Sequence, residues 1–272
     1  MLTRSPIVNT QVEKDYLGLN LKELPYFRSL VRAVEARFYR DFDLASPTLD
    51  LGCGDGQFAT VAFDRKIEVG LDPWEGPLHE ASQRSVYQLL IQADGTYIPF
   101  PDAYFASAIS NSVLEHIPLI DAVLAELSRV LQPGAFFLFC VPNHQFLNSL
   151  SIGNFFDRLH LHPLAKLYRR FFNRISRHYH CDPPEVWEKR LDQAGFEILD
   201  WWHYFPPTAM HVVEWGHYFG VPALLVKWLS GRWLITSKEW NIAWLRNWLN
   251  HYYLSEPRSD QGVYTFYVTR KR

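Results

Sequence analysis

The stretch from Thr48 to Gly56 constrains this chain more than any other part of its sequence. It reads Thr-Leu-Asp-Leu-Gly-Cys-Gly-Asp-Gly, an apolar run followed by three alternating glycines. This pattern is typical of a buried parallel strand that turns tightly into a helix, because only glycine lets a backbone approach a ligand so closely. Residues 57–63 can supply the helix. A nucleotide or a nucleoside is therefore the first ligand to consider.

The rest of the chain alternates apolar runs with amphipathic stretches, which predicts a parallel sheet with right-handed crossovers. Helices are expected at residues 25–39, from residue 120 up to Pro133–Gly134, and at residues 183–194. The first has one apolar face and one face rich in arginine, and Pro133–Gly134 are expected to end the second. Seven strands are predicted, at residues 49–51, 67–71, 87–93, 105–110, 135–141, 196–202 and 262–269.

Three aspartates fall where such a sheet presents its ligand, beyond the carboxyl ends of the strands. Asp72 ends the second strand twenty residues after Gly52, a position from which a carboxylate can accept hydrogen bonds from both hydroxyls of a ribose. Asp94 follows the third strand and can accept a hydrogen bond from an adenine amino group. Asp50 precedes the glycine turn, where its negative charge can hold an ammonium group.

The glycine pattern separates two candidate ligands. A dinucleotide site requires glycine at the sixth place counted from Gly52, and that place holds Gln57. The charge of Asp50 would also repel a pyrophosphate. A nucleoside that carries a cationic amino-acid tail therefore fits better than a dinucleotide.

Five motifs, in the same order, resemble those of class I S-adenosylmethionine-dependent methyltransferases, and the nearest branch is their type 11 group. The motifs are Leu49–Gly56, Gly70–Asp72, Gln92–Gly95, Val113–Ile117 and Leu131–Ala135. The resemblance implies a Rossmann-like, doubly wound α/β fold. Its sheet would have seven strands, mostly parallel with an antiparallel last strand. The resemblance also implies S-adenosylmethionine as the cofactor.

By the same resemblance, individual residues acquire roles. Asp50 would lie near the methionine end of the cofactor, while Asp72 would bind its ribose and Asp94 its adenine. The segment after the fourth strand would line the methyl-donor side. Cys53 also fits as a small filler, and Asp94–Gly95 as an ordinary turn. The predicted cofactor-binding residues are Asp50, Gly52, Cys53, Gly54, Gly56, Asp72, Pro73, Asp94, Gly95, Asn111, Ser112 and Val113.

The sequence does not single out a catalytic base. Methyl transfer from a sulfonium requires alignment of the nucleophile and exclusion of water, and therefore leaves few catalytic fingerprints. An oxygen acceptor also needs deprotonation, for which imidazole is suited. Glu115 and His116 form a candidate acid–base pair, although in this family the segment is usually architectural. The candidate catalytic histidines are His116, His144, His178 and His180.

Two helical insertions are expected to determine the acceptor. The first, residues 143–182, contains a basic amphipathic helix. Such a helix fits an anionic membrane, an anionic substrate or partner, or an ordinary apolar contact beneath a solvated cationic face. Its apolar positions are Leu164, Leu167, Tyr168, Phe171 and Ile175, and its basic positions are Lys166, Arg169, Arg170, Arg174 and Arg177.

The second insertion, residues 206–257, is rich in aromatic side chains. Its broad apolar face fits packing on the core, a lid over a hydrophobic acceptor, a dimer contact or an interfacial membrane anchor. Gly220–Pro222 are expected to interrupt the preceding helix. The face is formed by Trp240, Trp244, Trp248 and Tyr252, which recur every four residues, together with Ile242, Leu245 and Leu249.

Composition limits the other classes of function. The 272 residues carry a net charge of −2, which gives no general reason to expect nucleic acid. Three scattered cysteines predict neither a disulfide framework nor a metal centre and suit a reducing cytoplasm. No window reaches the ~20 apolar residues that span a bilayer, although peripheral contact with a membrane stays open. We expect one domain over residues 1–272, with an N-terminal helical segment at 1–47 and a cofactor-binding half at 48–142.

Together these features predict methyl transfer from S-adenosylmethionine to a small acceptor that is lipophilic or aromatic. Two alternatives stay open. One is methylation of a lipid-linked or saccharide precursor at a membrane surface. The other is a catalytically silent, cofactor-binding protein that uses the aromatic insertion as its interface. Formation of a homodimer is also left open.

Overall fold

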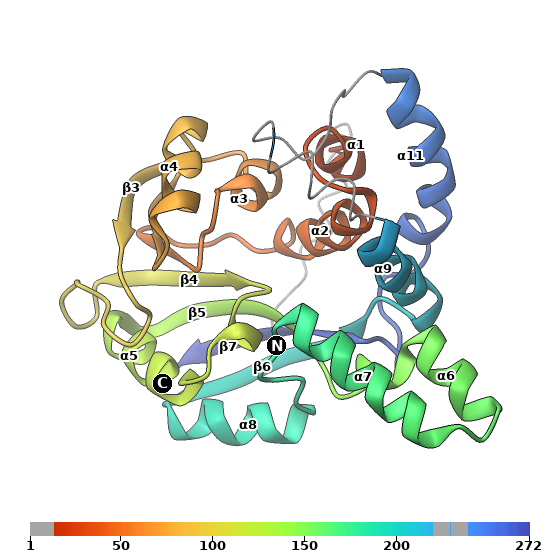
Figure 1. Ribbon diagram of the computed structural model, residues 1–272. Coiled ribbons are helices and arrows are strands. Elements are labelled where there is room, and N and C mark those ends of the chain that lie inside the picture. Colours follow the sequence, from red (N-terminus) through yellow and green to blue (C-terminus); the bar gives the residue numbers. More distant parts are fainter. Residues whose placement is uncertain (1–13, 220–228, 230–238) are drawn as a thin grey trace.

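The computed structural model describes residues 14–219, 229 and 239–272, and a seven-stranded sheet forms its centre (Figure 1). The strand order is β3-β2-β1-β4-β5-β7-β6, with β7 antiparallel to both of its neighbours and the first five strands parallel. The predicted fold class is confirmed. The strands are β1 (Thr48–Leu51), β2 (Ile67–Asp72), β3 (Tyr87–Gln92), β4 (Phe105–Asn111), β5 (Leu131–Pro142), β6 (Phe196–Tyr204) and β7 (Tyr264–Lys271).

Helices cover both faces of this sheet (Figure 1). On one face α5 and α8 bury their apolar sides against β4 and β5. On the other face α2 packs on β6 and β7, and α9 and α11 pack against α2. The described helices are α1 (Tyr16–Leu21), α2 (Tyr26–Tyr39), α3 (Gln57–Ala62), α4 (Glu75–Arg84), α5 (Ile120–Val130), α6 (Ser151–Arg158), α7 (His162–Ser176), α8 (Pro184–Gln193), α9 (Pro207–Phe219) and α11 (Glu239–Tyr253), with short 3-10 helices η1 (Leu114–His116) and η2 (Leu147–Ser149).

The junction between α5 and β5 differs from the prediction. The helix already ends at Val130, and Leu131 pairs with Phe105 of β4. The pairing then shifts, so that Phe136 faces Ser107, and Gly134 in the irregular stretch has a φ of +85°. Pro133–Gly134 therefore lie in a bulge of the strand and do not end the helix, because the backbone hydrogen bonds of Leu131 are taken up by the sheet.

The order of the strands creates a crevice between β1 and β4. From β1 the chain moves outward through β2 to β3 and then returns to β4 on the other side of β1. Ser110 Oγ donates a hydrogen bond to the carbonyl oxygen of Leu51 over 2.9 Å, which fixes the two strand ends side by side. Ligands of open α/β sheets bind at such a switch point, outside the carboxyl ends of the strands.

The first insertion is an α6–α7 hairpin that a single buried carboxylate of α9 holds in place. Glu214 accepts hydrogen bonds from Ser151 N and Ser151 Oγ, each over 2.6 Å, and from Ile152 N over 3.1 Å. Its Oε1 also accepts the hydroxyl hydrogen of Tyr168 over 2.6 Å. Because the amides belong to the first turn of α6, the negative charge lies at the favourable end of the helix dipole.

The predicted apolar face of α7 does not pack onto the core. Ala165 and Phe172 face inward, whereas Leu164, Leu167, Phe171 and Ile175 are exposed and Tyr168 is half-buried. The expectation of an ordinary apolar contact beneath that face is therefore wrong. The sequence pattern located the helix correctly but could not show which apolar side chains meet the protein.

In the second insertion, α11 packs with only part of its apolar face. Ile242, Leu249 and Tyr253 are buried, and Trp248 contacts the ring of Tyr26 edge-on at 5.8 Å, but Trp244 is exposed. The predicted interruption at Gly220–Pro222 lies outside the described residues. Among the residues whose structure is described, none of the helices has the length and hydropathy that crossing a bilayer requires.

Candidate functional site

The turn after β1 depends on glycine at three positions. Gly52, Gly54 and Gly56 have φ values of +79°, +54° and +72°, a region that side chains with a Cβ atom disfavour. A Cβ atom on Gly52 would lie 2.3 Å from Cγ1 of Val113, so this glycine lets β1 and the end of β4 approach closely. Among the described residues, a Cβ atom on Gly54 would meet nothing within 4 Å. The turn is thus closed at Gly52 and open at Gly54.

Asp72 lies beside this turn at the end of β2. Its Oδ2 accepts a hydrogen bond from Gly54 N and its Oδ1 one from Trp74 N, each over 2.9 Å. Burial raises the pKa of Asp72, and the two backbone hydrogen bonds oppose that rise. The carboxylate therefore braces the glycine turn, a structural role that the sequence did not indicate, in addition to facing the crevice.

Asp50 is buried in β1 and accepts a hydrogen bond from the Tyr87 hydroxyl over 2.6 Å. Burial raises its pKa to about 7, and the bond from Tyr87 partly offsets this effect. The tyrosine reaches Asp50 across Gly70, where any Cβ atom would lie 2.9 Å from the ring. Tyr87 was not predicted, because nothing in the spacing links the first residue of β3 to β1.

The remaining predicted cofactor residues follow the carboxyl ends of β1, β2 and β3. Asp94, two residues beyond β3, is exposed, and its Oδ1 accepts hydrogen bonds from Thr96 N and Oγ1. These bonds lower the pKa of Asp94 and form a turn. Cys53 is buried, and burial raises the pKa of its thiol. Pro73 accepts a hydrogen bond from Gln92, and a Cβ atom on Gly95 would meet Val123.

Asn111 and Ser112 after β4 are held by a residue that the prediction missed, Glu35 of α2. This fully buried carboxylate accepts hydrogen bonds from Asn111 Nδ2, Ser112 Oγ and the hydroxyl of Tyr204, over 2.7, 3.0 and 2.9 Å. Arg32, from the predicted arginine face, lies 3.3 Å from Glu35 and donates to the carbonyl of Asn111 over 3.0 Å. The sequence signal that could have revealed Glu35 is its position, since it is a lone acidic residue on the apolar face of α2.

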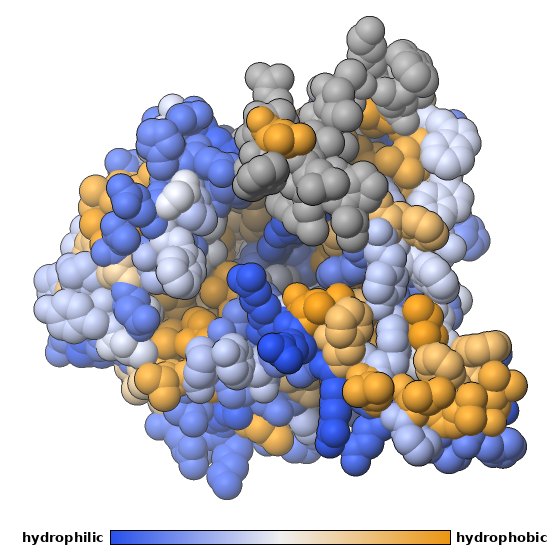
Figure 2. Space-filling model, viewed as in Figure 1, coloured by the Kyte–Doolittle hydropathy of each residue, from blue (hydrophilic) through white to orange (hydrophobic). Residues whose placement is uncertain are grey.

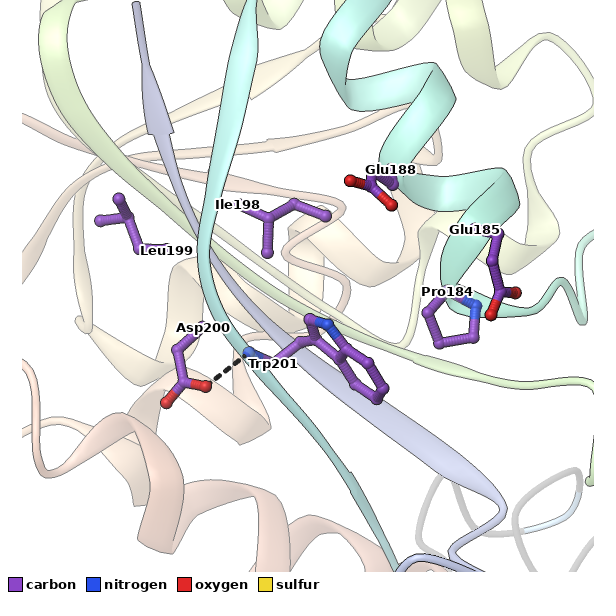
Figure 3. Close-up of a pocket in the computed structure, with 7 residues that line it drawn as sticks. All are labelled: Pro184, Glu185, Glu188, Ile198, Leu199, Asp200 and Trp201. Atoms are coloured by element: carbon purple, nitrogen blue, oxygen red, sulfur yellow. Dashed lines mark hydrogen bonds between the residues drawn. The ribbon is translucent and has the colours of Figure 1, made fainter.

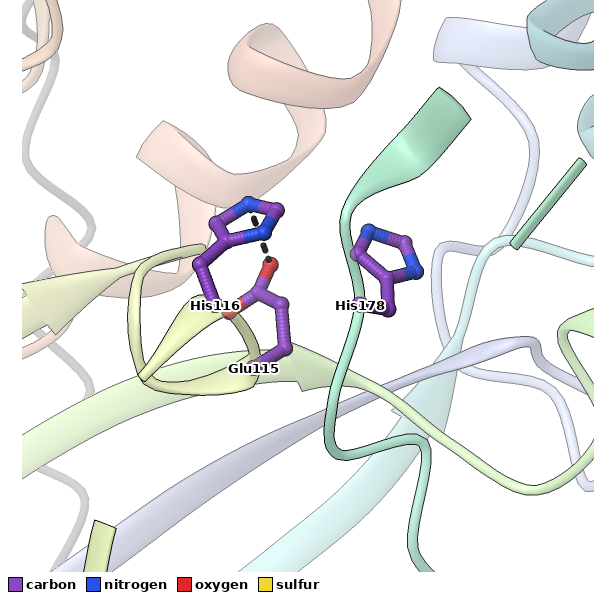
Figure 4. Close-up of side chains that lie close together, drawn as sticks. All are labelled: Glu115, His116 and His178. Atoms are coloured by element: carbon purple, nitrogen blue, oxygen red, sulfur yellow. Dashed lines mark ion pairs between the residues drawn. The ribbon is translucent and has the colours of Figure 1, made fainter. Parts of the chain in front are cut away.

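Glu115 and two of the four candidate histidines gather directly beyond Val113 (Figure 4). Glu115 and His116 belong to η1, and His178 follows α7; their ligand-type atoms all lie within 4.8 Å of one another. Glu115 is 2% exposed, and its Oε2 has no hydrogen-bond partner among the described residues. Burial raises the pKa of Glu115 to about 8, lowers that of His178 to about 3 and also lowers that of His116.

The hydrogen bonds of His116 fix which of its nitrogens is available. Nδ1 lies 3.0 Å from the carbonyl oxygen of Arg177, which can only accept a hydrogen bond. Nδ1 therefore carries the hydrogen, and Nε2 of the neutral ring keeps its lone pair. The structure thus presents one imidazole nitrogen that can accept a proton at neutral pH.

The other two candidate histidines lie apart from this group. His180 Nε2 lies 3.0 Å from the carbonyl oxygen of Ile117, and its Nδ1 lies 3.4 Å from Asp182, so its ring links the segment after α7 to η1. His144 is exposed, and its ring lies edge-on to that of His203 of β6, with the centroids 6.0 Å apart. Neither His144 nor His180 belongs to the group formed by Glu115, His116 and His178.

A cluster of one carboxylate and two imidazoles is also a set of metal ligands. Positive charge around it opposes that use, because Arg32, Arg177 and Arg28 all act on His116 to lower its pKa. A field that disfavours an imidazolium disfavours a divalent cation more strongly. These positive charges therefore make the group better suited to proton transfer than to metal binding.

Residues 49–139 match the model of a methyltransferase domain. A malonyl-[acyl-carrier protein] O-methyltransferase of Serratia marcescens is 37% identical over 92 residues, which cover 34% of this chain and 36% of that protein. An uncharacterized methyltransferase of Mycobacterium sp. is 34% identical over 87 residues, or 32% and 34% of the two chains. The match thus spans about a third of each relative.

Residues 49–139 of this chain thus match a methyltransferase domain. Solved structures share its fold: a possible histamine N-methyltransferase from Thermotoga maritima, at a TM-score of 0.54 and 14% identity, covers 90% of both chains. A methyltransferase from Archaeoglobus fulgidus, at 0.54 and 18%, covers 90% of this chain and 94% of its own. The [4+2]-cyclase SpnF, at 0.52 and 18%, covers 88% and 80%. At these identities the likeness concerns the fold alone.

The methyltransferase family implies S-adenosylmethionine as cofactor, and the residues of the crevice fit it. The space beside Gly54 leaves room for a ligand against the backbone. Asp72 and Asp94 supply carboxylate oxygens at the ends of β2 and β3, and the buried Asp50 supplies a third carboxyl group in β1. That these residues bind the cofactor stays a prediction.

A separate shallow depression of about 350 Å³ lies between α8 and β6 (Figure 3). It faces the middle of an edge strand, whereas the crevice of the methyltransferase domain lies beyond the carboxyl ends of β1 and β4. None of the predicted site residues borders it, so we do not assign it to the site. Its lining residues are Pro184, Glu185, Glu188, Ile198, Leu199, Asp200 and Trp201.

Proposed function

We propose that this protein transfers the methyl group of S-adenosylmethionine to a small acceptor that lies between the glycine turn and His178. The observation that carries this proposal is the contact between Gly52 and Val113, because it places the cofactor turn directly beside η1. When bound, the cofactor supplies a methyl group that is already activated by its sulfonium. The protein then has to hold the acceptor, exclude water and take up a proton where the acceptor carries one.

His116 is the proposed proton acceptor. Its Nε2 has a free lone pair, and the lowered pKa keeps the ring neutral at physiological pH. His178, whose ring is neutral for the same reason, lies beside it with ring centroids 5.1 Å apart. Glu115, with its raised pKa, is protonated at neutral pH. It therefore adds no negative charge that would stabilise the protonated form of the acceptor.

A lipophilic or aromatic acceptor is favoured by the rings that surround this group. The ring centroid of Phe146 lies 4.9 Å from that of His178, and the ring centroid of Phe172 lies 6.2 Å from that of Phe146. The named relatives include an O-methyltransferase and a possible N-methyltransferase, and the acceptor atom is left open among oxygen, nitrogen and carbon.

The main alternative is a lipid-linked or saccharide precursor that is methylated at a membrane surface. The exposed apolar side chains of α7 favour it. A catalytically silent binding protein is the second alternative, since SpnF shares this fold and is named as a cyclase. We place the protein in the cytoplasm, where its three free cysteines stay reduced.

Calorimetric titration with S-adenosylmethionine and S-adenosylhomocysteine tests the cofactor site. The wild type should bind both, and Asp72→Asn should weaken binding by about 10- to 100-fold, as expected for the loss of hydrogen bonds to a charged group. Asp43→Asn, at an exposed position, is the matched control. No binding by the wild type, or equal binding by a folded Asp72→Asn variant, would remove the basis of the proposal.

Transfer itself is tested by formation of S-adenosylhomocysteine with a panel of oxygen and nitrogen nucleophiles. His116→Gln should keep the affinity for S-adenosylhomocysteine and lower turnover by roughly 10²- to 10⁴-fold, the usual contribution of a general base. A wild type that binds the cofactor but forms no product with the panel or with a cell extract would favour the silent alternative.

A further inference from the structure

The α6–α7 hairpin carries an apolar surface that nothing in the described part of the chain covers. Figure 2 shows a continuous hydrophobic area over this end of the molecule. Leu167 is 63% exposed and Phe155 is 56% exposed, values that are unusual for side chains of this size. We define the hairpin surface by Phe155, Leu159, Leu164, Leu167, Phe171 and Ile175, all of which are exposed.

The exposed part of α7 divides into two parallel stripes. Leu164, Leu167, Phe171 and Ile175 are spaced by three or four residues and form one stripe. Lys166, Arg170 and Arg174 are spaced by four and form a second stripe beside it, and all three are exposed. Ala165 and Phe172 occupy the third side and hold the helix on the protein. Apolar and cationic side chains are thus presented together.

The charge of this hairpin is one-sided. Residues 151–177 contain six basic side chains and one acidic side chain, Asp157, which gives a net charge of +5. Asp157 is already engaged by Arg169 and His162. Among the described residues, no acidic side chain forms an ion pair with Lys166, Arg170 or Arg174. The whole chain, in contrast, has a net charge of −2.

We propose that the hairpin surface docks onto an anionic lipid membrane, with its apolar stripe inserted at headgroup depth and its basic stripe on the lipid phosphates. A helix with this division of its exposed side lies in the plane of a bilayer interface. A second copy of the chain is the weaker occupant, because a symmetric contact would bring two surfaces of charge +5 together.

Docking would also place the membrane beside the candidate acceptor site. The carbonyl oxygen of Arg177, which follows α7, binds Nδ1 of His116, and His178 is the next residue. A lipophilic acceptor that leaves the bilayer at α7 would therefore reach the two histidines along a short path. This last step rests on the proposed function, whereas docking itself does not.

Co-sedimentation with vesicles tests the docking. Vesicles of phosphatidylcholine alone are compared with vesicles that contain roughly one third phosphatidylglycerol. The full-length wild type should bind the anionic vesicles and lose that binding at high salt. Lys166→Gln/Arg170→Gln/Arg174→Gln should bind them about 100-fold more weakly, since each basic residue contributes roughly a fivefold factor. Leu167→Glu/Phe171→Glu should abolish binding.

Leu89→Glu serves as the control, because Leu89 is an exposed apolar residue on the edge strand β3. Near-ultraviolet circular dichroism and titration with S-adenosylhomocysteine show that each variant is folded. The proposal is overturned if the wild type ignores anionic vesicles, or if Leu167→Glu/Phe171→Glu binds them as the wild type does. It is also overturned if sedimentation equilibrium finds a wild-type dimer that this variant dissociates. Vesicle binding does not depend on methyl transfer, so its failure is distinct from failure of the proposed function.

Discussion

Glu35 of α2 accepts a hydrogen bond from the side-chain amide of Asn111, at the end of β4, over 2.7 Å. The two residues are 76 positions apart in the chain. The bond joins the N-terminal helix to the strand whose continuation, at Val113, closes against the glycine turn. The helix α2, which precedes β1 in the chain, therefore helps to position the end of β4 at the crevice.

The removal of this buried carboxylate should strongly destabilise the fold. Glu35→Ala leaves Arg32, Asn111 and Tyr204 without their acceptor in a dry environment. We expect a loss of about 3–5 kcal/mol in the free energy of unfolding, measured by urea denaturation. Glu188→Ala, at an exposed position of α8, should change it by less than about 0.5 kcal/mol. Similar values for the two variants would contradict the role of Glu35.

A comparison of Gly52 with Gly134 separates the stability cost of backbone strain from that of a steric clash, because both glycines have positive φ values. Gly134→Ala meets nothing within 4 Å and should cost only the strain, about 1–2 kcal/mol. Gly52→Ala meets Val113 as well and should cost clearly more in urea denaturation. Val113→Ala should return part of that difference in the double variant. Equal costs at the two glycines would show that the contact with Val113 is relaxed.

Glu214→Ala should release the α6–α7 hairpin while the sheet stays folded. The first turn of α6 would lose its acceptor for two amides, and Tyr168 would lose its only carboxylate partner among the described residues. Hydrogen exchange should show protection falling by about 100-fold in α6, or roughly 3 kcal/mol. Protection in β4 and β5 serves as the internal reference. Unchanged exchange in α6 would mean that apolar contacts alone hold it.

Glu115 should make stability depend on pH. Its pKa rises from 4.5 in the unfolded chain to about 8 in the folded one. The folded state thus binds the proton more tightly, so the contribution is fully present below pH 4.5 and is lost as the pH rises through 8. Glu115→Gln removes this dependence and should gain a few kcal/mol relative to the wild type over that range, at about 1.4 kcal/mol per pKa unit.

Urea denaturation of both proteins between these pH values measures the difference. Glu188→Gln, at an exposed position of α8, is the control and should follow the wild-type curve. Parallel curves for the wild type and Glu115→Gln would show that Glu115 is ionised in the folded protein. The proposed neutral environment around His116 would then need revision.

Local patterns were sufficient to predict the sheet. The apolar runs, the glycines after β1 and the aspartates at the ends of β2 and β3 lie within short stretches, so backbone preference and burial specify them without knowledge of the rest of the chain. The end of α5 was misplaced because the pairing of Leu131 with Phe105, far away in sequence, prevailed over the local signal of Pro133–Gly134.

The sequence by itself determined the class of the fold, the crevice and the kind of cofactor, because each rests on a short motif whose backbone needs are nearly unique. Only the tertiary structure decided which side chains meet across the crevice. It brought Tyr87 to Asp50 and Glu35 to Asn111. It also grouped His116 with His178 and not with His144 or His180. These contacts join segments that are distant in the chain. The same holds for α7, where periodicity predicted one apolar face, whereas packing placed Phe172 in the core and left Leu167 and Phe171 exposed to solvent.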